Sequence, residues 1–343
     1  MPVAAWAVLA GSVLAGMSAP LIAGCAVALI AAVFAAVYHA EVVAARVGEP
    51  FGTLVLAVAV TVIEVALVVS VMLGGGPDKA ALARDTVFAA VMIVCNGVVG
   101  LCLLAGGIKH HEQGFQVMGA SGALAVLAAL TTLTLVLPNF TISTPGPVFN
   151  VPQLAFAGVV SLVLYSVFVF VQTVRHREYF LIPGDDGHAV PGGWTTVLSA
   201  ILLVATLVAV VGLAKALSPA MEAGLNAAGA PKAVIGVVIA ALVLLPEGLA
   251  AVRAARADRL QTSLNLALGS ALASIGLTIP AVAAVSIALN QPLTLGLEPT
   301  EQVLLALTLL VSVLTLGTGR TTVLQGAVHL VILAVFLFLA VVP

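Results

Sequence analysis

The feature that most constrains this chain is a series of apolar runs, each about 20 residues long, that recurs through the whole sequence. An α-helix rises about 1.5 Å per residue, so such a run crosses a hydrocarbon core about 30 Å thick. Hydrophobic residues make up 62% of the chain and charged residues 8%, too little polar surface for a water-soluble globule. The runs show no period-2 alternation, which a membrane barrel would require. The sequence therefore predicts an all-α polytopic membrane protein.

Eleven runs are long enough, and no Lys or Arg precedes the first, so we interpret it as a helix and not as a signal peptide. The runs lie at 3–18, 21–38, 51–74, 84–107, 115–137, 152–174, 194–216, 232–252, 263–288, 301–317 and 322–342.

The basic residues of the loops predict the orientation. With a cytoplasmic N-terminus, eight of them fall in inner loops and four in outer loops. The inner set is Arg46, Lys109, Arg175, Arg177, Arg253, Arg256, Arg259 and Arg320, and the outer set is Lys79, Arg84, Lys215 and Lys232. We expect the N-terminus inside and the C-terminus outside.

Two glutamates stand in the middle of apolar runs, Glu64 in "AVTVIEVALVV" (59–69) and Glu247 in "AALVLLPEGLAAV" (240–252). Intramembrane carboxylates are costly and usually face the interior of a helix bundle, where they mark ion pathways. A structural hydrogen bond to a neighbouring helix could explain one such residue. A pair placed alike in the two halves of the chain favours a functional role for both.

The two glutamates also indicate a repeat. Runs two to six and seven to eleven are sets of five, and each set carries its glutamate in its second helix. A duplicated unit with an odd number of helices inserts upside down, as in many transporters. We therefore expect an extra N-terminal helix (1–20), a first repeat (21–174), a cytoplasmic linker loop (175–193) and a second repeat (194–343).

The helix after each glutamate is rich in small residues, at 96–107 and 269–280. Such residues let helices approach closely. Gly100, and Gly276 with Pro280, are also expected to permit irregular backbone whose carbonyls face a site.

An inverted repeat brings Glu64 and Glu247 together near the midplane, and no Lys or Arg lies within the membrane core to neutralise them. Two buried carboxylates then need protons or cations to balance their charge. One divalent cation, two monovalent cations or two protons each bring the site to neutrality. The pair therefore favours exchange of a cation for protons.

The remaining candidate ligands are oxygen donors, which suit hard ions such as Ca²⁺ or Na⁺. They are the side chains of Thr61, Asn96, Ser270 and Ser274, together with a backbone carbonyl freed by Pro246. For Asn96, Ser270 and Ser274, hydrogen bonding between helices is an equally good explanation. We interpret His329 as a contact between helices. No phosphate-binding loop and no basic stripe occurs, so we expect no cofactor and no nucleic-acid partner, only the transported ions and the lipid bilayer.

Three stretches resemble a known family: 39–65, "KHHEQGFQ" at 109–116, and 243–280. They are similar to the calcium/cation–proton exchangers of the cation/calcium exchanger superfamily, most closely the bacterial ChaA-type sodium, potassium and calcium/proton antiporters. The resemblance implies an extra first helix, two inverted five-helix repeats, one essential acidic residue per repeat at Glu64 and Glu247, and a bacterial inner-membrane location.

Departures from the family pattern leave the ion open among Ca²⁺, Na⁺ and K⁺. Relatives usually carry Asn three residues before each glutamate, where this chain has Thr61 and Leu244. The loop at 175–193 is interpreted first as a linker and second as a cation-sensing element. We expect a secondary antiporter, not an enzyme, that exports Ca²⁺, and Na⁺ or K⁺, in exchange for protons. The alternatives are a passive channel lined by the same glutamates and a membrane scaffold.

Overall fold

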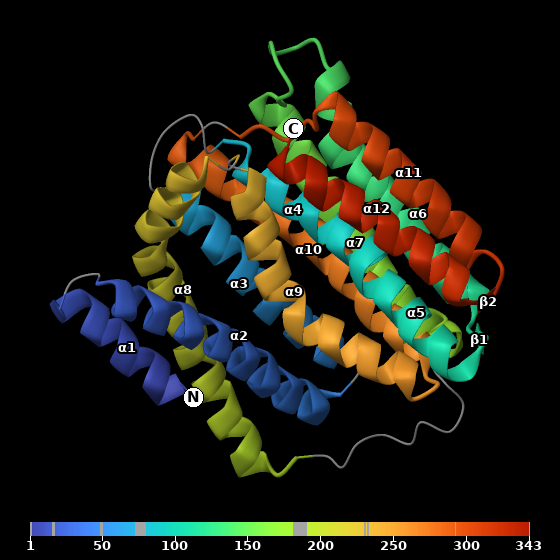
Figure 1. The fold of residues 1–343 in the computed structure, drawn as a ribbon, viewed down its shortest axis with the longest axis horizontal. Coiled ribbons are helices and arrows are strands. Elements are labelled where there is room, and N and C mark those ends of the chain that lie inside the picture. Colours follow the sequence, from blue (N-terminus) through green and yellow to red (C-terminus); the bar gives the residue numbers. More distant parts are fainter. Residues whose placement is uncertain are drawn as a thin grey trace.

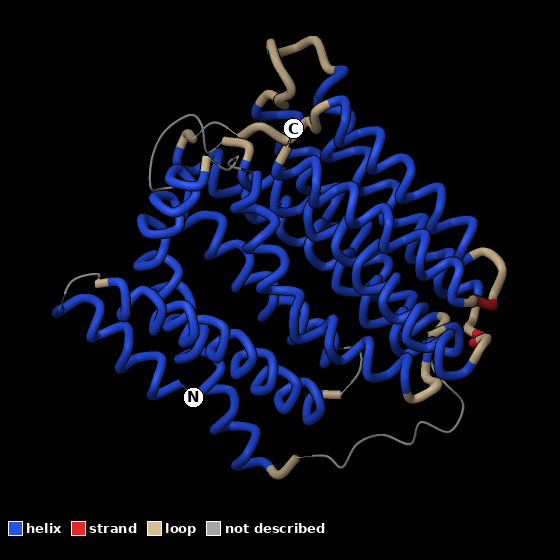
Figure 2. Tube along the Cα trace, in the orientation of Figure 1, coloured by secondary structure: helices blue, strands red, loops and turns tan. Residues whose placement is uncertain are grey.

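The structure is a computed structural model, and it describes residues 2–15, 18–48, 51–72, 80–180, 191–229, 231, 233–291 and 293–342. Most of the linker loop, including Asp185 and Asp186, lies outside the described residues, as do Lys79 and Lys232. The described part of the chain is almost entirely helical (Figure 2). Two strands of two residues each, β1 (Gln113–Gly114) and β2 (Arg320–Thr321), pair antiparallel with Gln113 opposite Thr321.

The described helices join into eleven rods that match the predicted runs one to one. Three rods are irregular: α4 (Leu82–Met92) continues through the π-helical η2 (Ile93–Val98) into α5 (Val99–His110); α6 (Val117–Thr131) ends in η3 (Thr132–Val136) and η4 (Leu137–Phe140); and α7 (Val151–Phe170) ends in η5 (Val171–Arg175), which η6 (Arg177–Tyr179) follows. The others are α1 (Pro2–Ala15), α2 (Ala19–Val47), α3 (Phe51–Met72), α8 (Gly193–Ala228), α9 (Ala233–Arg256), α10 (Leu260–Leu289), α11 (Pro299–Leu316) and α12 (Val323–Val341).

Nine of the described rods are long and apolar enough to cross a membrane, and shorter apolar stretches occupy α1 and α3. This confirms the all-α polytopic prediction. Two rods are much longer than predicted, because α2 continues to Val47 and α8 continues through Pro219 to Ala228. Hydropathy marks only the part of a helix that lies in hydrocarbon, so the apolar run ends before the helix does.

Several rods begin at residues whose side chains satisfy the free amides of a first turn. Asn150 accepts from the backbone amide of Gln153 at 2.9 Å, while Gln153 accepts from that of Asn150 at 3.1 Å. Capping boxes also start α11 and α12, and proline stands in the first turn of α7 and α11. These capping residues and prolines explain where α7, α11 and α12 begin.

Because the rods alternate in direction, the bundle has two ends (Figure 1). We call one the linker end: there α2, α5, α7 and α9 finish, and α3, α8 and α10 begin. At the other, the far end, α3 and α10 finish, and α4 and α11 begin.

The packing pattern is the same when the two halves are exchanged. The glutamate helix α3 packs on α10, and its counterpart α9 packs on α4 and α5. Likewise α7 packs on α10, and α12 packs on α5, while the first helices of the halves, α2 and α8, pack on each other. Two inverted sets of five helices account for this exchange. The domain boundaries stay a prediction.

Glycines let the rods approach as predicted. A Cβ on Gly100 would lie 3.1 Å from the Cβ of His329, and one on Gly276 would lie 2.7 Å from the Cβ of Tyr165. The expectation of irregular backbone was wrong at Gly276 and Pro280, because α10 is α-helical through both. The irregular turn is η2, directly before the helical Gly100. These two glycines therefore serve close packing.

Candidate cation site

Glu64 on α3 and Glu247 on α9 both lie inside the bundle, with exposed fractions of 1% and 9%. At about 1.5 Å per residue, Glu64 stands about 20 Å from the linker end of its helix and Glu247 about 14 Å. The two helices pack on α10 and on each other. The predicted acidic pair is thus buried at mid-depth, with Glu247 nearer the linker end.

Glu64 is held by hydroxyl groups of α10. Ser274 Oγ and Thr278 Oγ1 each donate to Glu64 Oε2 at 2.9 Å. Ser274 was predicted from the sequence, and Thr278 was missed. The spacing in the sequence could have identified Thr278. Residues four apart share a helix face, and Ser270, Ser274 and Thr278 follow one another at that interval.

Buried oxygens without a hydrogen-bond partner gather at the predicted residues. Of the seven such side-chain atoms in the described residues, five are Thr61 Oγ1, Glu64 Oε1, both carboxylate oxygens of Glu247, and Ser270 Oγ. A buried polar atom without a partner costs about 1–3 kcal/mol, and more when it is charged. Such a concentration at one place calls for a functional explanation.

A cavity of about 360 Å³ leads to Glu247 from the linker end. Its walls come from the last turn of α2, the first half of α3, the end of α7 and the first half of α10, and Glu247 and Ser270 line it. Glu64 is not among its lining residues. The two carboxylates therefore differ: Glu247 borders a cavity and has no partner, whereas Glu64 is enclosed and held by two hydroxyls.

Asn96 makes its contacts elsewhere. It lies on η2, and its Nδ2 donates to Thr308 Oγ1 at 2.9 Å. Its Oδ1 is 3.1 Å from Nδ1 of His329, whose Nε2 is 3.2 Å from Thr315 Oγ1. The side-chain amide of Asn96 thus joins η2 to α11 and α12. Hydrogen bonding between helices was the second explanation that the sequence allowed for this residue. His329 is the contact between helices that we expected.

Pro246 precedes Glu247 without interrupting α9, which stays helical on both sides. Proline has no backbone N–H, so the carbonyl one turn earlier loses its usual donor. That carbonyl belongs to Leu242. Its position near the Glu247 carboxylate stays a prediction.

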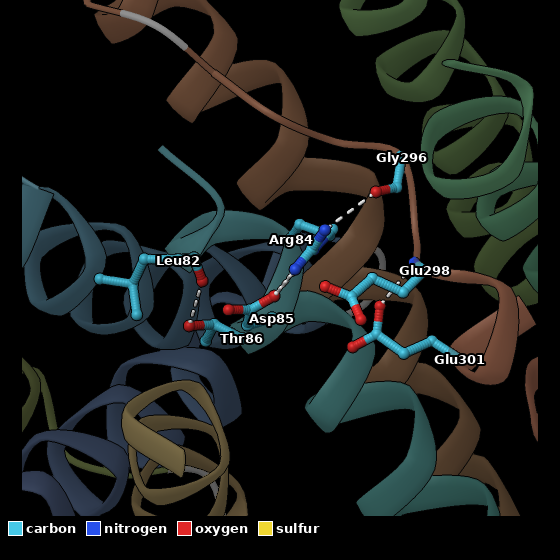
Figure 3. A network of polar contacts seen from close by, with 7 residues as sticks. All are labelled: Leu82, Arg84, Asp85, Thr86, Gly296, Glu298 and Glu301. Atoms are coloured by element: carbon cyan, nitrogen blue, oxygen red, sulfur yellow. Dashed lines mark hydrogen bonds and ion pairs between the residues drawn. The ribbon is translucent and has the colours of Figure 1, made fainter. Parts of the chain in front are cut away.

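At the far end, the segment 293–298, which precedes α11, is packed into the bundle. Its leucines, Leu293, Leu295 and Leu297, are buried. Arg84 at the start of α4 fixes it: Arg84 Nη1 donates to the carbonyl of Gly296 at 3.0 Å, and its Nε donates to Asp85 Oδ1 at 2.8 Å (Figure 3).

The site suits hard cations. Within the described ranges no group of three or more His, Cys, Asp or Glu side chains comes together, so a soft-metal centre is not formed there. Two carboxylates with the hydroxyls of Thr61, Ser270, Ser274 and Thr278 are oxygen donors, which Ca²⁺ and alkali ions take.

Fold and site together define a multi-pass membrane protein with two buried carboxylates between helices of opposite direction. The sequence matches the family described as sodium/calcium exchanger protein over residues 17–174 and 198–342. The chain belongs to this family.

Two curated relatives share most of its length. A Sinorhizobium fredii protein named for ionic transport, y4hA, is 56% identical over 95% of this chain and 88% of its own. The sodium-potassium/proton antiporter ChaA of Escherichia coli is 34% identical over 91% and 86%. Among solved structures, YfkE aligns with a TM-score of 0.77 at 18% identity, covering 99% of this chain and 98% of that one. The H⁺/Ca²⁺ exchanger CAX aligns with a TM-score of 0.73 at 13% identity, covering 98% and 87%. These two likenesses concern the fold.

Proposed function

We propose that this protein is a secondary active cation/proton antiporter. It exports Ca²⁺, and Na⁺ or K⁺, in exchange for protons by alternating access at Glu64 and Glu247. The N-terminus, and with it the linker end, faces the cytoplasm of a bacterium, and the C-terminus faces outside. The observation that carries the proposal is the set of partnerless oxygens on Thr61, Glu64, Glu247 and Ser270.

Electrostatics supports exchange. In the described part of the bundle the buried Arg84 is paired with Asp85 at the far end, so it offers no fixed positive charge to the pair. An empty site with two charges would be costly to enclose, whereas a site holding a cation or protons is neutral. Cation and protons therefore take turns on the same carboxylates. The names of ChaA, an antiporter of sodium, potassium and protons, and of CAX, an H⁺/Ca²⁺ exchanger, agree with this class of cargo.

The access path argues against a passive channel. The cavity runs from the linker end to Glu247, and Glu64 beyond it is 1% exposed. At the far end, the buried leucines of 293–298 pack this segment into the bundle. Access from one side at a time is the requirement of an exchanger, and a channel needs a continuous path.

The native protein in sealed vesicles provides the test. With the membrane potential held at zero by valinomycin and equal K⁺ on both sides, an outward gradient of Ca²⁺ or Na⁺ is expected to acidify the interior, because each cation that leaves is replaced by protons. An internal pH dye records the change, and choline replaces the cation as the control. K⁺ is tested separately by its power to collapse an imposed pH gradient. Cation flux without proton movement would indicate a channel, and no flux of any of the three ions would refute the proposal.

Removing the hydroxyls that hold Glu64 is expected to weaken cation binding. A hydrogen bond to a charged group contributes about 1.5–3 kcal/mol, so Ser274→Ala or Thr278→Val should raise the half-saturating cation concentration by about tenfold to a hundredfold. The matched controls are Ser161→Ala and Thr206→Val, whose buried hydroxyls donate to carbonyls of their own helices. Saturation curves of proton-coupled flux give the answer. Unchanged half-saturation in both α10 variants would assign these hydroxyls to helix packing alone.

A further inference from the structure

The cavity at the linker end is larger than an inorganic cation needs. Its 360 Å³ corresponds to about 12 water molecules at about 30 Å³ each. It falls within the range of about 300–1,000 Å³ that is typical of sites for small organic molecules. Size alone therefore admits a ligand with a carbon skeleton.

The walls combine aromatic, aliphatic and polar residues. Tyr165, Phe168 and Phe180 line the cavity, and the rings of Phe168 and Phe180 meet edge to face with centroids 6.0 Å apart. Glu247 supplies the negative charge, with both oxygens buried and without a hydrogen-bond partner, and Asn265 adds an amide. An ammonium group is attracted both by a carboxylate and by the faces of aromatic rings. Apolar walls around one carboxylate match a cation that has an apolar body.

The aromatic wall is fixed in place by α10. Asn265 Nδ2 donates a hydrogen bond to the carbonyl of Phe180. Gln261 Nε2 donates to Asn265 Oδ1 at 2.9 Å and lies 3.4 Å from the carbonyl of Tyr179. Two amides thus tie the segment after α7 to the helix that carries Ser270. A wall that is already formed costs little ordering when a ligand binds.

We propose that this cavity binds hydrophobic organic monocations, with the ammonium group at Glu247 and the apolar body against Phe168 and Phe180. Such a ligand enters from the linker end and competes with the transported cation. The inference rests on the proposed function in one respect: Glu247 is the carboxylate that accepts cations from the cavity.

The probe is radiolabelled benzyltrimethylammonium, and its binding is measured by equilibrium dialysis on the full-length protein in lipid nanodiscs. We expect one saturable site per chain, from which Na⁺ or Ca²⁺ displaces the probe and neutral benzyl alcohol does not. Glu247→Gln should weaken binding at least tenfold. Aromatic contacts contribute about 0.5–1.5 kcal/mol, so Phe180→Leu, which removes one from the apolar body, should weaken it by about 2- to 10-fold. Phe140→Leu, which changes an exposed ring at the far end, is the control and should bind the probe normally.

Measuring ion exchange on the same purified variants, reconstituted in sealed vesicles, separates the two proposals. Exchange that needs Glu247, together with no saturable probe binding, would overturn the organic-cation site and leave the antiporter intact. Probe binding that Glu247→Gln leaves unchanged would also overturn it, because the ligand would then sit elsewhere. Probe binding that needs Glu247 in a protein without cation–proton exchange would support the site and remove the antiporter.

Discussion

Replacing Glu247 with glutamine is expected to reduce the proton flux that is coupled to any cation by at least a hundredfold. Glutamine keeps the shape of the side chain but neither carries the negative charge nor exchanges a proton. Glu247 borders the cavity and has no hydrogen-bond partner, so its carboxylate is free to bind a cation or a proton. Glu64→Gln should have the same effect, because Ser274 and Thr278 both donate to Oε2 of this one carboxylate, and an amide in its place carries no charge and exchanges no proton. The rate of internal pH change in dye-loaded vesicles measures the proton flux of both variants.

Glu112→Gln is the matched control. This substitution has the same chemistry at an exposed carboxylate that pairs with Arg320 at 3.2 Å outside the bundle interior. It should keep full flux, since exposed ion pairs contribute about 0–1 kcal/mol. Normal exchange by either buried variant, with protein content in the vesicles verified, would reduce its glutamate to a packing residue.

The second large effect is expected at Gly326, where α12 meets α5. A Cβ there would lie 2.5 Å from the backbone nitrogen of Leu104 and 2.9 Å from the carbonyl oxygen of Gly100. Backbone atoms cannot rotate away as a side chain does, so Gly326→Leu must separate the two helices. Overpacking typically costs about 1–3 kcal/mol, and a backbone clash on both sides exceeds this. We expect loss of the monodisperse protein, or a large fall in its thermal midpoint, on size-exclusion chromatography after heating.

Gly122→Leu controls for the change of residue type. Gly122 is exposed on α6, and a Cβ there meets nothing within 4 Å. Leucine is a better helix former than glycine by about 0.8 kcal/mol, so this variant should be as stable as the native protein or more so. Equal thermal midpoints for the two variants would contradict the tight α5–α12 contact.

The number and order of the helices could be predicted from the sequence because lipid leaves few choices. A run of apolar residues in hydrocarbon has to satisfy its backbone internally. The ends of α2 and α8 could not be predicted, since a helix continues into the polar interface where hydropathy falls. The π-helical turn η2 left no readable pattern in its residues.

At the candidate site, the sequence predicted that two carboxylates are buried, but it could not predict which way the other polar side chains point. Glu64 and Glu247 stand out because a carboxylate in lipid is expensive. Asn96 and Ser274 look alike in the sequence, yet one joins η2 to α11 and α12 and the other holds Glu64. Which way a polar side chain points depends on helix rotation, and η2 changes the rotation just before α5. The cavity draws its walls from separate segments, so only the fold could show it.

The segment 293–298 has a consequence for how the far end opens. Its backbone amides at Thr294, Gly296 and Leu297 donate to carbonyls of three separate segments, at Ala80, Pro147 and Leu135. Swinging it outward would break these bonds and expose three leucines, at about 1.5–3 kcal/mol each. The open form would then be rarer than about one molecule in a thousand. This segment is therefore expected to keep its place in the fold. In the proposed alternating-access mechanism, an outward-open state would form by movement of the surrounding helices and not by movement of this segment.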